Sequence, residues 1–131
     1  MSSSEPAAPP RVGLVTKDLM IRSRVEAGLG EMAARVEMIL GDRLTGAFDL
    51  LLLDLNRDAA ERLAWLARVA PTQPGVEVIC FGPHTEMAEL NPTARAAGAS
   101  RCVANSHLPE TLQRWLRSRG GAPPRPRRAT A

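Results

Sequence analysis

Short apolar segments alternate with amphipathic segments along most of the chain, and this alternation predicts a sheet covered by helices. Strands are expected at residues 12–16, 35–40, 49–54, 76–81 and 101–104. The third of these, DLLLLD, is a continuous apolar run that ends on the carboxylate of Asp54. Such a run is typical of a central parallel strand that is buried on both faces.

The segments between the first strands predict helices. Asp18 is expected to cap a helix that runs to about Leu29, because an Asp side chain accepts a hydrogen bond from a first-turn N–H. Residues 41–48 leave room for two helical turns at most. Residues 57–69 predict an amphipathic helix whose inner side carries Ala60, Leu63, Ala64 and Ala67.

The second half of the chain predicts two more helices. The stretch after residue 83 is expected to be helical up to Gly98, with an interruption at Asn91 and Pro92, since Asn is a frequent cap and Pro favours the first turn. Residues 109–119 form the final helix, whose inner side carries Leu112, Trp115 and Leu116.

Strands that alternate with helices indicate a parallel sheet with helices on both faces and right-handed crossovers. We therefore predict an α/β, flavodoxin-like three-layer fold with a five-stranded parallel sheet in the order 2-1-3-4-5 and a shortened second helix. The ligand site of such a sheet lies where strands 1 and 3 end. Thr16, Lys17 and Asp54 fall at that place.

The predicted domain covers residues 11–119. Residues 1–10 are rich in Ser, Ala and Pro, and residues 120–131, GGAPPRPRRATA, are basic and rich in Gly and Pro. Both ends are expected to be disordered, because such compositions bury little apolar surface.

Charge and hydropathy restrict the location and the partners. The 131 residues carry a net charge of +3, but six of the sixteen arginines lie in the tail or just before it, without a series of interleaved aromatic residues. We therefore expect no nucleic-acid surface. No apolar run approaches the length of about 20 residues that a membrane span needs. The first residues lack the pattern of a signal peptide, so a cytoplasmic protein without membrane contact is expected.

Residues that bind metals or catalyse reactions are few. Cys80 and Cys102 lie in apolar stretches without CxxC spacing, and they are expected to be reduced core residues. His84 and His107 follow the fourth and fifth strands, but solvated loop histidines are favoured over a metal site with Asp54. Ser106 lies in no G-x-S-x-G turn, and no glycine-rich nucleotide loop is present. The sequence therefore predicts no metal site, no cofactor and no enzyme.

Three segments, RVGLVTKD, FDLLLLDLN and AAGASRCVANS, resemble the bacterial response-regulator receiver family across nearly all of residues 11–119. The resemblance implies that Asp54 stands at the phospho-acceptor position. Asn56, two residues later, is placed to offer a backbone carbonyl to a metal ion. Asp54 is the one part of five that the chain retains, since any residue at position 56 could offer a backbone carbonyl.

The other site positions depart from the family pattern. The resemblance implies two acidic Mg²⁺ ligands after the first strand, a Ser or Thr after the fourth and a Lys after the fifth. The residues found there are Thr16 and Lys17 with Asp18 one step further, then Gly82, and then Asn105. Lys17 is the chain's only lysine, and two hypotheses follow: Lys17 pairs with Asp54 and locks one state, or Lys17 faces solvent and backbone amides bind Asp54.

These departures indicate a degenerate member of the family, a pseudo-receiver. It would act through protein–protein contact with a histidine kinase or another regulator, without the usual Mg²⁺-dependent phosphorylation. The alternative is a functional single-domain response regulator in a two-component phosphorelay, phosphorylated on Asp54 with Mg²⁺. In the family, the fourth helix, fifth strand and fifth helix bind partners and in some members form a homodimer. Here this face would include Met87, Leu90, Arg95, Arg101, His107, Leu112 and Arg114.

Overall fold

A computed structural model describes residues 10–30 and 36–120 of the chain. The strands are β1 (Val12–Val15), β2 (Val36–Met38), β3 (Leu50–Asp54), β4 (Glu77–Gly82) and β5 (Arg101–Ala104). The α-helices are α1 (Leu19–Leu29), α2 (Ala59–Val69), α3 (His84–Ala97) and α4 (Leu108–Gly120). Two short 3₁₀ helices, η3 (Ala70–Thr72) and η4 (Asn105–His107), join them.

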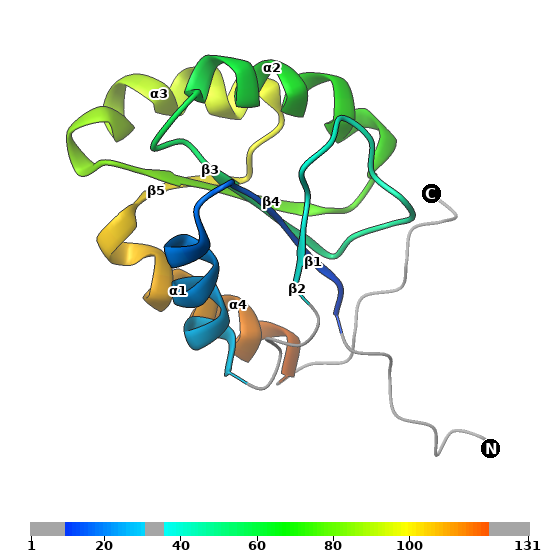
Figure 1. Cartoon of the computed structure of the whole chain (residues 1–131), viewed down its shortest axis with the longest axis vertical. Helices are drawn as coiled ribbons and strands as arrows, with labels where there is room; N and C mark the ends of the chain where they lie inside the picture. The colour runs from blue at the N-terminus through cyan, green and yellow to red at the C-terminus, as the bar shows by residue number, and fades with distance from the viewer. Residues whose placement is uncertain (1–9, 31–35, 121–131) are drawn as a thin grey trace.

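The five strands form one parallel sheet in the order β2-β1-β3-β4-β5. Helices α2 and α3 cover one face of the sheet, and α1 and α4 cover the other (Figure 1). The predicted three-layer fold and strand order are therefore confirmed. Every residue of β3 is buried, as its continuous apolar sequence predicts.

Side chains of β3 alternate between two cores, because successive residues of a strand point to opposite faces. Leu51 and Leu53 pack with the buried residues of α2. Leu50 and Leu52 pack with Leu29 of α1 and with α4. Burial of each leucine side chain contributes roughly 1.5–3 kcal/mol to the free energy of folding, so this strand is a principal source of stability.

The predicted short helix within residues 41–48 is wrong, because this segment is a loop in the structure. Gly46 has a φ of 84°, a left-handed value that interrupts a helix. The buried side chain of Gln73 donates to the Gly46 carbonyl at 2.8 Å and accepts from the Phe48 N–H at 2.8 Å. The loop backbone thus finds its hydrogen bonds outside the segment and does not need helical ones.

The predicted interruption at Asn91 and Pro92 is also wrong, since α3 runs through both residues. Met87 and Ala94 are buried on either side of the proline, whereas Pro92 itself is exposed. Helix α3 packs against α2 and β5. These contacts hold the helix together although Pro92 offers no backbone N–H.

The inner side of α2 differs from the prediction. Leu63 is buried as expected, but Ala60, Ala64 and Ala67 are exposed. The other buried positions hold larger side chains, namely Trp65, Leu66 and Val69. Burying these larger apolar surfaces is worth more than burying alanine, so their side of the helix faces the sheet.

Helix α4 follows its prediction more closely. Leu112 is fully buried, and Trp115 and Leu116 are partly buried against the same core. The burial of Leu112, together with that of Met87, corrects the predicted partner face, because neither side chain is available at the surface.

Several predictions concern positions outside the described part of the chain. The expected disorder of residues 1–10 and 120–131 falls almost wholly there, as does residue 35 of the predicted second strand. Within residues 10–30 and 36–120, no helix has both the length and the apolar character that crossing a bilayer demands.

Candidate functional site

The candidate site lies where β1 and β3 end. Val15 and Leu53 are in register on these neighbouring strands, so Thr16 and Asp54, which come next in each segment, lie side by side. Asp54 is only 3% exposed. A carboxylate this deeply buried needs hydrogen-bond donors around it, and the structure supplies three together with an arginine 3.6 Å away.

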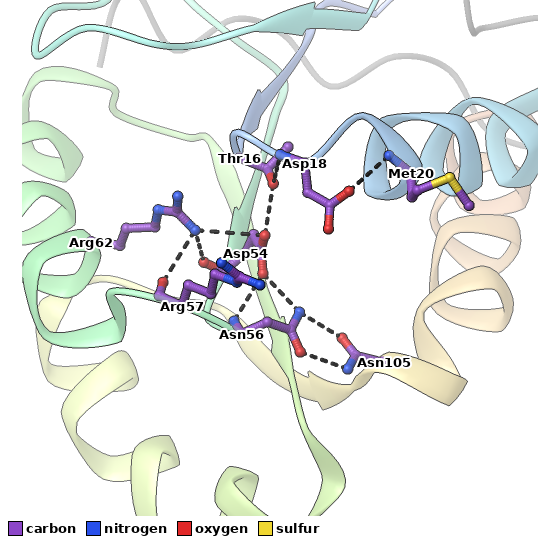
Figure 2. A network of polar contacts seen from close by, with 8 residues as sticks. All are labelled: Thr16, Asp18, Met20, Asp54, Asn56, Arg57, Arg62 and Asn105. Carbon is purple, nitrogen blue, oxygen red and sulfur yellow. Dashed lines mark hydrogen bonds and ion pairs between the residues drawn. The ribbon is translucent and has the colours of Figure 1, made fainter.

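Thr16 contacts one oxygen of the Asp54 carboxylate. The Thr16 hydroxyl donates to Asp54 Oδ2 at 2.7 Å, and its oxygen accepts from the Asp18 N–H at 3.1 Å. Figure 2 shows the Thr16 hydroxyl between the Asp54 carboxylate and the backbone of Asp18. The Asp18 carboxylate accepts from the Met20 N–H at 2.8 Å and caps α1, as predicted.

Asn56 binds the other oxygen twice. Its backbone N–H donates to Asp54 Oδ1 at 2.8 Å, and its side-chain Nδ2 donates to the same atom at 2.7 Å. Nδ2 also donates to Asn105 Oδ1 at 3.1 Å, and Asn105 Nδ2 donates back to Asn56 Oδ1 at 2.8 Å. Asn105 is therefore connected to Asp54 through the side chain of Asn56 and not by a direct contact.

Arg62 of α2 supplies the cation of the site. Its Nη1 lies 3.6 Å from Asp54 Oδ2, and the same group donates to the backbone carbonyls of Asp54 and Arg57. The Arg62 side chain is only 11% exposed, and Figure 2 shows it reaching across from the helix towards Asp54. The sequence analysis did not single out this residue, because the periodicity of an amphipathic helix places an arginine on its polar side.

Lys17 does not pair with Asp54. Among the described residues it forms no ion pair and its side chain is exposed. The predicted Lys17–Asp54 lock is therefore wrong, and Arg62 takes the role that it assigned to Lys17. The alternative hypothesis is right about Lys17 but incomplete about Asp54, which side chains bind as well as the Asn56 amide.

Gly82 ends β4 and is buried. A Cβ atom at this position would lie 2.7 Å from Cε of Met87 and 3.4 Å from the Leu55 backbone. The methyl group of Met87 thus fills the space where the resemblance implies a hydroxyl side chain.

The two histidines do not reach the site. His84 is the exposed first residue of α3, and His107 is exposed in η4. Within the part of the chain that the structure describes, no three His, Cys, Asp or Glu residues lie close enough together to hold a metal ion.

An open cleft of about 490 Å³ lies over Asp54. Its lining combines three acidic, three basic and two exposed apolar side chains with one amide: Asp18, Asp54, Asp58, Lys17, Arg57, Arg62, Leu19, Met20 and Asn56. Solvent and small ions can therefore reach the neighbourhood of the carboxylate.

The donor set around Asp54 does not fit the Mg²⁺ ion that the receiver resemblance implies. Mg²⁺ requires oxygen ligands in an octahedron, usually from carboxylates and water. Here the groups directed at Asp54 are a hydroxyl proton, two amide N–H groups and a guanidinium. Asp18, the acidic residue that follows Thr16 and Lys17, is engaged as the α1 cap. The described residues thus offer donors where a cation needs acceptors.

A scan against protein-family models gave no match, and a comparison with curated proteins gave none either. Solved structures do match. The activated receiver domain of DrrB from Thermotoga maritima is 19% identical, with 88% of this chain and 100% of that chain covered and a TM-score of 0.70. The chemotaxis regulator CheY4 of Vibrio cholerae is 20% identical, with 85% and 98% covered and a TM-score of 0.65.

This chain has the receiver fold. The same fold is present in a structure from Burkholderia thailandensis whose name assigns it to pilus assembly, at 17% identity, with 86% of this chain and 99% of that chain covered and a TM-score of 0.62. Proteins named for different roles thus share the fold, and its role in this chain has to be argued from the site.

Proposed function

We propose that this chain is a pseudo-receiver: a non-catalytic signalling module that acts through protein–protein contact without Mg²⁺-dependent phosphorylation of Asp54. The observation that carries the proposal is the occupancy of both Asp54 oxygens. Oδ2 accepts from Thr16 and faces Arg62, while Oδ1 accepts two hydrogen bonds from Asn56.

Phosphoryl transfer depends on positioned charge more than on covalent chemistry, so a receiver without that charge loses most of its rate. The chain has Thr16 and Lys17 at the family's acidic positions and Asn105 at its lysine position. Arg62 is a cation, but its Nη1 is bound to two backbone carbonyls beside Asp54. An arginine held in this way stabilises the resting carboxylate.

The proposed partners are other signalling proteins, such as a histidine kinase or another regulator. The exposed part of the α3–β5–α4 surface would make the contact, through side chains that are mostly basic: Arg95, Arg101, His107 and Arg114, with the partly buried Leu90. A homodimer through this surface is the other form that such contact could take. Sedimentation of wild type and an Arg101→Glu/Arg114→Glu double variant would separate the two, because only a homodimer changes mass when these charges are reversed.

The phosphorylation test uses the full chain with Mg²⁺ and either acetyl phosphate or beryllium fluoride. Intact mass would report a phosphoryl group, and the fluorescence of Trp65 and Trp115 would report a conformational change. We expect neither to change, while an authentic receiver treated in parallel responds in both. A Mg²⁺-dependent gain of one phosphoryl group that disappears in Asp54→Asn would overturn the proposal in favour of a functional single-domain response regulator.

A further inference from the structure

Two cysteines that are 22 residues apart in the sequence face each other in the sheet. Cys80 of β4 and Cys102 of β5 are partners in the parallel register. Both belong to the core on the α2 and α3 side of the sheet. Register partners on neighbouring parallel strands project to the same face, so the two thiols are neighbours.

A third sulfur completes the cluster from α3. The Cys102 thiol donates a weak hydrogen bond to Sδ of Met87 at 3.6 Å. Gly82 makes room for Met87, because a Cβ atom there would lie 2.7 Å from the Met87 methyl group. Two thiols and one thioether thus converge from β4, β5 and α3.

The three sulfur-containing residues are largely buried, but solvent can reach one of them. Cys80 is fully buried and Met87 is nearly so, whereas Cys102 is partly exposed and offers a route from solvent. Burial, and to a smaller extent the neighbouring Cys102, raises the pKa of Cys80 to about 12. Burial also raises the pKa of Cys102, but the nearby Arg95 lowers it. Arg95 is therefore positioned to favour negative charge on this sulfur.

The sulfur spacing is compatible with one shared ion. Both cysteines are free thiols, and neighbouring strands lie about 4.8 Å apart. Two sulfurs that bind one ion at about 2.3 Å with a tetrahedral angle are separated by about 3.8 Å. The observed 3.6 Å between Cys102 Sγ and Met87 Sδ is close to that separation.

We propose that Cys80, Cys102 and Met87 form a binding site for a soft monovalent metal ion, Cu(I). Thiolate and thioether ligands select Cu(I), whereas structural zinc takes four ligands, and the described residues provide no fourth His or Cys here. On binding, two S–H bonds break, two Cu–S bonds form, and both protons leave to solvent. Met87 adds a dative bond from its sulfur, and Arg95 balances the negative charge of the complex.

The proposed metal site does not use Asp54. A failure to bind Cu(I) would therefore not contradict the proposed signalling function. The two sites share no ligand, although Met87 also fills the space beside Gly82 at the end of β4. The Asp54 carboxylate is bound by residues after β1 and β3 and by α2, whereas the sulfurs come from β4, β5 and α3.

The test titrates the reduced full chain with Cu(I) under anaerobic conditions, in competition with a chromophoric Cu(I) chelator. We expect one ion per chain, with two protons released per ion. Ag(I), which undergoes no redox chemistry under these conditions, should bind with the same stoichiometry and raise the melting temperature, since a ligand that binds only the folded state stabilises it.

Variants identify the ligands. Cys102→Ser should lose binding, and Met87→Leu should weaken it about tenfold, the lower end of the range for removing a supporting metal-site group. Met20→Leu, at an exposed position on α1, is the matched control and should bind as the wild type does. Gly82→Ser should weaken binding by displacing the Met87 side chain.

Three results would overturn the proposal: no binding that survives chelator competition, one ion shared by two chains, or equal affinities for Met87→Leu and Met20→Leu. Cys80 is buried, so the Cys80→Ala variant is first checked for its fold by circular dichroism. If it does not fold, Cys102→Ser and Met87→Leu still decide the outcome.

Discussion

Asn56 and Asn105 bind each other through both of their side-chain amides, although 49 residues separate them in the sequence. Asn105 Nδ2 donates to Asn56 Oδ1 at 2.8 Å, and Asn56 Nδ2 donates to Asn105 Oδ1 at 3.1 Å (Figure 2). The pair joins the loop after β3 to the 3₁₀ turn after β5. It also orients Asn56, whose Nδ2 donates to Asp54 as well.

The first prediction concerns this amide pair. Asn105→Ala should lower the free energy of unfolding by about 1 kcal/mol, because it leaves a part-buried amide of Asn56 without a partner. Chemical denaturation of both proteins would measure the difference. Ser106→Ala, at the exposed neighbouring position, is the control and should leave stability unchanged. Equal effects of the two substitutions would show that the pair does not stabilise the loops.

The second prediction compares Arg62 and Lys17, two of the three basic residues that line the cleft. Arg62→Gln should cost about 2 kcal/mol, because it removes hydrogen bonds and an ion pair from a buried carboxylate and its backbone. Lys17→Gln removes the same charge from the same cleft but should change stability by less than about 0.5 kcal/mol, as exposed substitutions do. Denaturation midpoints of the two variants would test this. A larger loss for Lys17→Gln would restore the Lys17–Asp54 lock.

The third prediction concerns the pH dependence of stability. The pKa of Cys80 is raised from 9.0 to about 12 by burial in the folded chain. The folded state therefore holds the thiol proton more tightly than the unfolded state. The resulting stability is fully present below the unfolded pKa and is lost as pH rises through the folded pKa, that is, between about pH 9 and 12.

The measurement compares wild type with Cys80→Ala at neutral pH and at about pH 10.5, within the window in which the thiol ionises on unfolding. The wild type should lose more stability over this interval than the variant. Cys102 is present in both proteins, so the part of its raised pKa that comes from burial is common to them. Parallel losses would mean that burial does not hold the Cys80 proton.

The fourth prediction concerns the proline inside α3. Pro92→Ala should stabilise the chain by about 1–3 kcal/mol, because alanine restores a backbone N–H and avoids the clash of the ring with the preceding turn. Thermal unfolding would measure the gain. Pro83→Ala, at the N-cap of the same helix, is the control and should give no gain, since proline is compatible with its φ of −62°. A destabilised Pro92→Ala would indicate that the ring has a packing role.

Much of the fold could be predicted because each buried strand is visible in the sequence as a run of apolar residues. The run before Asp54 has no polar residue, which identifies a central strand without knowledge of its neighbours. The two errors about helix boundaries arose where distant residues decide the local structure. The Gln73 side chain forms hydrogen bonds with the backbone of the loop that contains Gly46. Contacts with α2 and β5 stabilise α3 so that the helix continues past Pro92. Local patterns do not contain these partners.

The site was predicted in part for the same reason. Thr16, Asp54 and Asn105 follow strands, and the topology alone brings strand ends to one edge of the sheet. Arg62 lies on a helix, where periodicity distinguishes apolar from polar sides but does not show that an arginine turns back to a buried carboxylate. Arg62 lies eight residues after Asp54, near the start of the helix that follows the strand. This short separation is the signal that was available in the sequence.

The hydrogen bonds of Gln73 divide the crossover from β2 to β3 into two parts with different tolerance to a change in length. Phe48 and Gly46 are bound to one side chain, so an inserted residue between them would break one of the bonds. Residues 40, 41 and 43 precede the two residues that Gln73 binds, and they are exposed. An insertion there only lengthens a surface loop, at a cost that grows slowly with length. Natural variants of this chain should therefore differ in length before Gly46 and keep a constant length from Gly46 to β3.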